Sequence, residues 1–213
     1  NFLMGKVIAF SNQKGGSGKS TLSANIAVLW SNSGYKVAVI DADPQKSLSY
    51  WLTERKKYYG ENDIGIDFYH FDIRNLPDEI KQIKRKYDYI IIDSPPAITF
   101  ETIQIVKVSN GIFVPVQPSP LDLMATLPFL QIARDERKKP LIILNRVMPR
   151  ARLTDAMVLR LRYSGAKVAR SRISSKVIFA ETFAVGRGVI DINVTSDASR
   201  EIINVGNEIL RNL

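Results

Sequence analysis

The stretch NQKGGSGKST at residues 12–21 determines how the rest of this sequence is interpreted. It follows the apolar run KVIAFS and precedes a segment with helical periodicity, which is the strand–loop–helix context of a phosphate-binding loop. Its glycines would let backbone N–H groups converge on phosphate oxygens, and the helix would add the positive end of its dipole. Gln13, however, replaces the first glycine of the common G-x-x-x-x-G-K-[ST] pattern, and an additional lysine, Lys14, follows it.

Two side chains of this loop have chemistry suited to a nucleoside triphosphate. Lys19 is expected to reach the β- and γ-phosphates, and the hydroxyl of Ser20 is expected to bind Mg²⁺. The loop residues predicted to hold the nucleotide are Lys14, Gly15, Gly16, Ser17, Gly18, Lys19, Ser20 and Thr21.

Carboxylates end two of the expected strands, in the segments VIDADPQ and YIIIDSPP. Asp41 and Asp43 are spaced i, i+2, so both can leave the strand end toward the phosphate loop. Asp93 ends an apolar strand, as does the Walker B carboxylate that holds Mg²⁺ through water. Residues 94–97 would then sense the γ-phosphate as a switch. We therefore predict a Mg²⁺ site from Ser20, Asp41 and Asp93, with Asp43 positioning the attacking water.

A late strand ends at Asn145 in the segment PLIILNRV. The amide of asparagine offers both a donor and an acceptor, as needed to recognise the edge of an adenine base. Asparagine also caps turns, so a structural role at this position is the alternative.

The size and composition of the chain indicate one well-packed domain over residues 1–213, with no function assigned to residues 1–3. With 213 residues and 45% hydrophobic content, the chain can bury about 70% of its unfolded surface. The sequence has no cysteine, which excludes disulfides, iron–sulfur clusters and cysteine–zinc sites. His70 is expected to be a strand or surface residue. No apolar run approaches the ~18 residues of a membrane span, so we expect a cytoplasmic protein.

Short β-branched runs alternate with longer periodic segments along most of the chain. This alternation predicts an α/β fold, a doubly wound and mostly parallel sheet with helices on both faces. Helices are expected at residues 19–33, from residue 47, through residue 130, and in the IKQIKRK region. Later elements are less regular, with helices expected at residues 154–164 and 196–213 and a short strand at residues 167–169.

The positive charge is uneven along the sequence. Between Arg134 and Lys176 there are thirteen Lys and Arg against three acids, a local net charge of +10, whereas the whole chain has +9. This excess fits either a solvated basic face or a surface that binds a phosphate backbone.

The segments KGGSGKST, VIDADPQ, IIIDSPP, VPVQPSPLDL and LNR together resemble the deviant Walker A family of ParA/MinD-type ATPases, over essentially the whole chain. The signature of that family begins at the lysine, so Gln13 is no defect. The resemblance implies a P-loop NTPase fold, ATP and Mg²⁺ as cofactors, and weak intrinsic hydrolysis. It also implies that Lys14 crosses to the nucleotide of a second subunit in an ATP sandwich dimer. Lys14, Lys19 and Asp43 are then the catalytic residues.

Within this family the chain is most similar to the short ParA proteins of plasmid and chromosome segregation, the ParF type. Because the phosphate loop begins only about fourteen residues into the sequence, we expect no helix-turn-helix extension of the kind found in longer ParA proteins. The resemblance implies ATP-dependent, nonspecific binding to duplex DNA, nucleoid association, and a centromere-binding adaptor of the ParB or ParG type. The candidate DNA-contacting residues are Arg150, Arg152, Arg160, Arg162, Arg170, Arg172, Lys176 and Arg187.

The main alternatives are a MinD-like membrane-associated regulator and a metabolic ATP-dependent ligase similar to the dethiobiotin synthetases. A MinD-like protein would have a basic amphipathic helix at its C-terminus, whereas SREIINVGNEILRNL contains two basic and two acidic residues. We therefore expect the last helix to pack on the domain and predict no membrane binding. The proline-rich segment 114–124 is either a rigid loop or, by resemblance, part of the nucleotide-dependent subunit interface.

Overall fold

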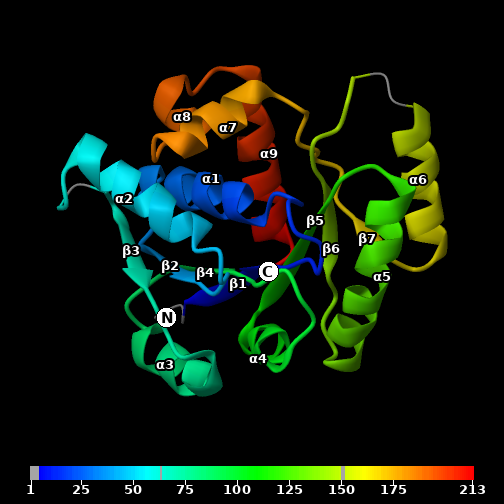
Figure 1. Cartoon of the computed structure of the whole chain (residues 1–213), viewed down its shortest axis with the longest axis horizontal. Coiled ribbons are helices and arrows are strands. Elements are labelled where there is room, and N and C mark those ends of the chain that lie inside the picture. The colour runs from blue at the N-terminus through cyan, green and yellow to red at the C-terminus, as the bar shows by residue number, and fades with distance from the viewer. Residues whose placement is uncertain (1–4, 63, 150–151) are drawn as a thin grey trace.

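The computed structural model describes residues 5–62, 64–149 and 152–213, and it has a central sheet with helices on both faces (Figure 1). Seven strands follow the order β3-β2-β4-β1-β5-β6-β7, and all six ladders between them are parallel. This is the doubly wound α/β fold expected from the sequence. The strands are β1 (Lys6–Phe10), β2 (Val37–Asp41), β3 (Ile66–Tyr69), β4 (Tyr89–Asp93), β5 (Gly111–Val116), β6 (Leu141–Leu144) and β7 (Lys167–Val168).

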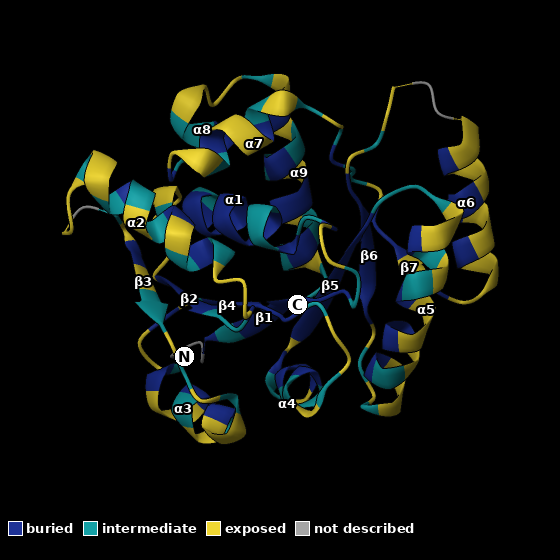
Figure 2. Cartoon of the chain, viewed as in Figure 1, coloured by how far each residue is buried: buried dark blue, intermediate teal, exposed yellow. Residues whose placement is uncertain are grey.

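One side of the sheet carries five helices within the described ranges: α1, which is buried along most of its length (Figure 2), and α2 pack on the strands, and α7, α8 and α9 pack on α1. Their apolar side chains join those of β1, β2 and β4 in one core cluster, which includes Trp30 and Trp51. The helices are α1 (Lys19–Asn32), α2 (Ser47–Tyr59), α7 (Val177–Ala184), α8 (Val189–Ile192) and α9 (Asp197–Arg211).

The opposite face is covered by a second core cluster, in which Ile80, Ile105, Phe129 and Leu161 pack on the alternate side chains of the same strands. The central strands are buried on both faces, which explains their nearly uninterrupted apolar sequences. The elements on this face are η1 (Ile73–Asn75), α3 (Leu76–Ile83), α4 (Phe100–Val108), α5 (Pro120–Asp135) and α6 (Arg152–Tyr163).

The last helix packs on the domain, as the sequence predicts. In α9, Ile202, Val205 and Ile209 are buried against α1. Gly206 permits this close approach, because a Cβ atom there would lie 2.5 Å from Leu29 Cδ2. No helix within the described ranges is long and apolar enough to cross a membrane.

The structure differs from the sequence expectations in several places, and one of them is α4, a helix that the sequence analysis did not include. The helices α7 and α8 were not anticipated, since the sequence of α7, VIFAETFA, is too uniformly apolar to show a helical period, and α8 is a single turn. The helix through residue 130 continues to Asp135. The helix expected over IKQIKRK ends at Ile83, so residues 84–86 lie in the turn before β4.

Candidate nucleotide-binding site

The phosphate loop lies at the carboxyl edge of the sheet, between β1 and α1. The strand register pairs Asp41 of β2 with Asp93 of β4, and Asp93 in turn with Phe10 of β1. The two strand-end carboxylates and the loop therefore meet at one place, as predicted from the sequence, because parallel strands end at the same edge. This is the usual position of a ligand site in an open α/β sheet.

The backbone of the loop is shaped for an anion. Gly16 has φ 73° and Gly18 has φ 101°, in the left-handed region that favours glycine. A Cβ atom on Gly18 would lie 2.0 Å from the side-chain nitrogen of Asn145. Among the described residues no side chain caps the N-terminus of α1, so its first-turn N–H groups are available to phosphate oxygens.

Lys19 points into this loop and is only 4% exposed. Its Nζ donates a hydrogen bond to the carbonyl of Lys14 at 3.3 Å. Burial lowers the pKa of Lys19, while the carboxylates of Asp93 and Asp43 partly offset that effect. A bound phosphate would supply the negative charge that favours the protonated lysine.

Ser20 and Asp93 form the pair best suited to Mg²⁺. The Ser20 hydroxyl donates to Asp93 Oδ2 at 2.6 Å, and the buried Asp93 Oδ1 has no hydrogen-bond partner among the described residues. Burial raises the pKa of Asp93 to about 8; the nearby carboxylate of Asp41 adds to this shift, and the Ser20 hydrogen bond and Lys19 oppose it. A cation would remove this cost of burial, so the donor set fits Mg²⁺.

No group of three or more acidic, histidine or cysteine side chains in the described part of the chain could hold a metal ion by itself. Mg²⁺ ordinarily binds one or two protein oxygens and completes its shell with phosphates and water. Ser20 and Asp93 would supply the protein ligands, and Mg²⁺ when bound would neutralise charge on the phosphates.

The carboxylates of Asp41 and Asp43 differ in the groups that they contact. Both oxygens of Asp41 accept hydrogen bonds, one from the N–H of Asp43 at 3.1 Å and the other from the N–H and hydroxyl of Ser49 at 3.0 and 2.9 Å. Asp43 accepts from the N–H of Gln45 at 2.9 Å and lines a hollow of about 250 Å³ with Lys19 and the loop glycines. The geometry thus favours Asp43 for contact with a nucleotide, and Asp41 for holding the β2–α2 loop.

Asn145 lies beside the same loop, at the end of β6. It is 5% exposed, and its amide nitrogen donates to the carbonyl of Ser17 at 2.9 Å. It also lines a smaller hollow of about 110 Å³ with Thr21, Arg146 and Phe179. The amide therefore supports the phosphate loop, and recognition of adenine by its remaining groups stays a prediction.

Lys14 turns away from its own phosphate site toward α5. It forms an ion pair with Asp122, and the Lys14 side chain is 41% exposed while that of Asp122 is 9% exposed. Burial would raise the pKa of Asp122, but hydrogen bonds from Lys14 and Ser119 outweigh it and hold the pKa below its ordinary value. Asp122 was not predicted from the sequence; Ser119 and Asp122 have the spacing of a helix-capping pair, which was the available signal.

The proline-rich segment also contacts the loop. The side-chain nitrogen of Gln117 donates to the carbonyl of Gly16 at 3.0 Å, and Ser11 donates to the hydroxyl of Ser94 at 2.5 Å. Gln117 follows β5 and Ser94 follows β4, so these contacts connect both segments to the nucleotide site. Sequence reasoning gave no role to Gln117 and did not anticipate Phe183 of α7, which lines the same hollow as Asp43.

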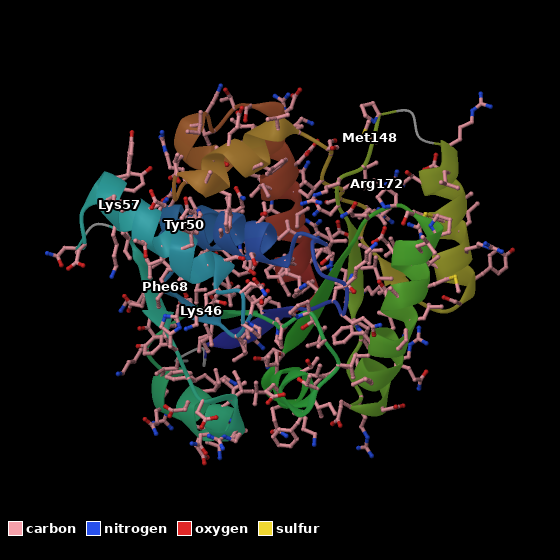
Figure 3. All side chains as sticks on the ribbon, viewed as in Figure 1. Lys46, Tyr50, Lys57, Phe68, Met148 and Arg172 are labelled. Carbon is pink, nitrogen blue, oxygen red and sulfur yellow. The ribbon has the colours of Figure 1, made fainter. Side chains whose placement is uncertain are left out.

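The candidate DNA-contacting residues are dispersed. Arg172 lines a hollow of about 500 Å³ with Met148 (Figure 3) and pairs with Asp155 at 3.3 Å. Lys176 pairs with Glu201 at 2.9 Å. The Arg187 guanidinium lies 4.6 Å from the Tyr58 ring centroid, against α2. Arg150 lies outside the described residues, and the exposed candidates without an ion pair in the described ranges are Arg152, Arg160, Arg162 and Arg170.

The sheet order, the glycine loop at the start of α1 and the strand-end carboxylates define a P-loop nucleotide-binding protein. The family model described as the CobQ/CobB/MinD/ParA nucleotide binding domain matches residues 8–189. The chain therefore belongs to this family, as a P-loop ATPase of the ParA/MinD type.

Two relatives that match over nearly their whole length have names that refer to carboxysome distribution and to chromosome partitioning. The chain is 29% identical over 210 residues to maintenance of carboxysome distribution protein A of Halothiobacillus neapolitanus, covering 95% of each chain. It is 26% identical over 235 residues to the chromosome-partitioning ATPase Soj of Thermus thermophilus, covering 95% of this chain and 94% of Soj.

Solved structures support the fold. A Cyanothece McdA variant in complex with ATP matches with a TM-score of 0.81 at 17% identity, covering 96% of each chain. The septum site-determining protein MinD of Pyrococcus horikoshii with Mg-ADP matches with a TM-score of 0.77 at 21% identity, covering 97% of this chain and 96% of MinD.

Proposed function

We propose that this chain is a DNA-partitioning ATPase, in which Mg²⁺ and ATP close a sandwich dimer that binds DNA without sequence preference. The observation on which the proposal depends is the position of Lys14. Lys19 already lies inside the phosphate loop, whereas Lys14 extends toward α5 with 41% of its side chain exposed. A second cation placed at the rim is suited to a phosphate on another subunit.

In this proposal the residues of the site divide the work of hydrolysis. Lys19 in one subunit and Lys14 from the partner stabilise the charge that develops on the transferring phosphoryl group. Asp43 orients the attacking water, and Ser20 with Asp93 would hold Mg²⁺, which polarises the phosphates when bound. Intrinsic turnover is expected to be slow, since a complete site requires the second subunit and an activating partner.

DNA binding would follow from dimerisation. Arg152, Arg160 and Arg162 are exposed on α6, and a dimer would present two copies of this surface. Linked binding sites strengthen each other through effective concentration, and several phosphate contacts give a steep salt dependence. We propose a nucleoid-associated protein in the cytoplasm whose hydrolysis is stimulated by a centromere-binding adaptor, and whose cargo is DNA or, as in the carboxysome relative, another large particle.

Retention on long nonspecific duplex DNA tests this function. The wild-type protein and Lys14→Ala are compared with ATP or ADP plus Mg²⁺ over a series of salt concentrations. We expect retention with ATP only, loss of retention at high salt, and no retention of Lys14→Ala although it still binds nucleotide. Retention that ignores the nucleotide, or none at all, would reject the proposal.

A further inference from the structure

The turns that lead into the strands lie at the edge of the sheet opposite to the phosphate loop, because all the strands run parallel. We call this the amino edge and define it by the turns before β2, β4, β6 and β7. None of these turns belongs to the nucleotide site.

Two of these turns contribute cations from the N-terminal half of the chain. Lys36 precedes β2, and Lys84, Arg85 and Lys86 lie between α3 and β4. The strands β2 and β4 are neighbours in the sheet. Arg85 and Lys86 are exposed, and neither forms an ion pair within the described ranges.

The turns before β6 and β7 contribute cations from the C-terminal half. Arg137, Lys138 and Lys139 connect α5 to β6, and Lys167 opens β7 beside it. Arg137, Lys139 and Lys167 are exposed, whereas Lys138 donates to the carbonyl of Ser109 at 2.8 Å and supports the turn. The fold therefore brings cations from both halves of the sequence to one edge.

Two acidic residues near these cations, Asp88 and Glu136, already contact other groups. A carboxylate oxygen of Asp88 accepts the backbone N–H of Lys36 at 2.8 Å, and Glu136 lies 3.9 Å from the ammonium group of Lys107. In the part of the chain that the structure describes, the side chains of Arg85, Arg137 and Lys139 form no ion pair, so they can bind an external anion.

The turn at Arg137 has a backbone shape that arginine rarely adopts. Arg137 has φ 58°, a left-handed conformation that glycine and asparagine favour at the end of a helix. Hollows of about 370 and 270 Å³ flank this turn, and Lys138 and Lys139 line both of them. Arg137 is exposed at this position, although a glycine or asparagine would suit the backbone conformation better.

We propose that the amino edge binds the phosphate backbone of duplex DNA, an inference that rests on the proposed function and identifies a surface distinct from α6. Adjacent strands are ~4.8 Å apart, so the cations between β2 and β7 span about 24 Å. A row of this length matches an extended polyanion, with many phosphates along it, better than a single phosphate group.

This placement has a consequence for the dimer. If the phosphate loops face each other in an ATP sandwich, the two amino edges point away from each other. One dimer would then hold two separate duplex segments, one at each end.

Paired neutral variants test the edge. Arg137→Asn with Lys139→Gln removes two charges, and asparagine suits the left-handed backbone; Arg85→Gln with Lys86→Gln removes two charges at the other end. The matched control is Lys56→Gln with Lys57→Gln on α2, and Arg160→Gln with Arg162→Gln on α6 serves as the comparison with the other proposed DNA surface. All variants are checked by thermal unfolding, and their binding to duplex DNA with ATP is measured over a salt series.

We expect each edge variant to reduce the slope of log K against log salt by about 2, since each lost contact accounts for about 0.9. The α2 control should bind as the wild type does, and ATP hydrolysis should be unchanged in both edge variants. Wild-type binding by the edge variants, with loss only in the α6 variant, would overturn the inference and leave the proposed function standing. If the wild-type protein does not bind DNA, both the inference and the proposed function are rejected. If the edge variants lose binding to anionic vesicles but not to DNA, the amino edge is instead a membrane-binding surface.

Discussion

The ion pair between Lys14 and Asp122 opposes the movement of Lys14 toward a second subunit. In the single chain the Lys14 ammonium group is held by the Asp122 carboxylate, which Ser119 also binds. Because Lys14 is 41% exposed, solvent screening limits the strength of the pair to about 1 kcal/mol or less. Lys14 must leave this partner before it can reach a second subunit.

Replacing Asp122 with asparagine should therefore favour the dimer. We expect Asp122→Asn to increase the fraction of dimer at subsaturating ATP by a few fold, since the cost of breaking this partly exposed ion pair is removed. Light scattering at graded ATP concentrations measures this fraction. Ser119→Ala, which leaves Lys14 paired, is the control, and a smaller dimer fraction in Asp122→Asn would contradict the role given to this pair.

Among the residues of the nucleotide site, the sequence predicted those that belong to short, continuous motifs. The loop glycines, Lys19, Ser20 and Asp93 belong to short motifs, and the structure brings them together. The partner of Lys14 was not predicted, because Asp122 is distant in sequence and only the strand order brings α5 to the loop. Likewise, the amide contact of Asn145 depends on the packing of β6 near Gly18, which composition does not reveal.

At the scale of elements, a buried ion pair attaches α8 to α2. Arg55 and Asp191 are 2.8 Å apart with side-chain exposures of 5% and 7%, and Asp191 also accepts the N–H of Gly188 at 2.8 Å. Removing one partner leaves the other charge buried and unpaired, which typically costs about 3–5 kcal/mol.

We expect Asp191→Asn to lower the free energy of unfolding by about 3 kcal/mol, measured by denaturant unfolding. The double variant Arg55→Met with Asp191→Leu should lose less, because it leaves no unpaired charge. Equal losses in the single and double variants would show that the pair does not attach α8 to α2 in this way.

A second connection joins α9 to the segment after β7. Glu208 accepts the N–H groups of Arg170 and Ser171, both at 2.8 Å. Burial opposes ionisation of Glu208, but these hydrogen bonds outweigh it and lower its pKa. The stabilisation is therefore complete above the ordinary pKa of 4.5 and is lost as the pH falls through the lowered value in the folded state.

Glu208→Gln should reduce stability by about 1 kcal/mol at neutral pH, and this loss should shrink as the pH falls below 4.5 through the lowered pKa of the wild-type carboxyl group. Thermal unfolding over pH 3–7 measures this difference. A difference that persists unchanged at pH 3 would indicate lost packing rather than lost hydrogen bonds of the carboxylate.

The helices were predicted most accurately where the sequence shows a clear helical spacing of apolar residues. The helices α6 and α9 lie within two residues of their expected positions, since α9 has a clear apolar face. The helices α7 and α8 were missed because their identity depends on tertiary contacts, such as the hydrogen bond from the Val189 N–H to Asn25 at 2.9 Å.

At the scale of the whole molecule, the parallel sheet separates two kinds of chemistry. The carboxyl edge holds the phosphate loop and carboxylates, and the amino edge holds cations from turns far apart in the sequence. The sequence predicted a basic C-terminal half, but linear charge counting could not show that residues 84–86 lie at the same edge as residues 137–139. Only the strand order gives that result.

The central claim is that Lys14 acts on the nucleotide of a second subunit, and a mixing experiment tests it directly. Lys14→Ala and Asp43→Ala should each hydrolyse ATP poorly. In a mixed dimer, the Lys14→Ala subunit keeps Asp43 and receives Lys14 from its partner, so one site is complete. We predict that an equimolar mixture hydrolyses ATP well above the sum of the separate variants. A rate equal to that sum, under conditions where the mixed dimer is shown to form, would contradict the account.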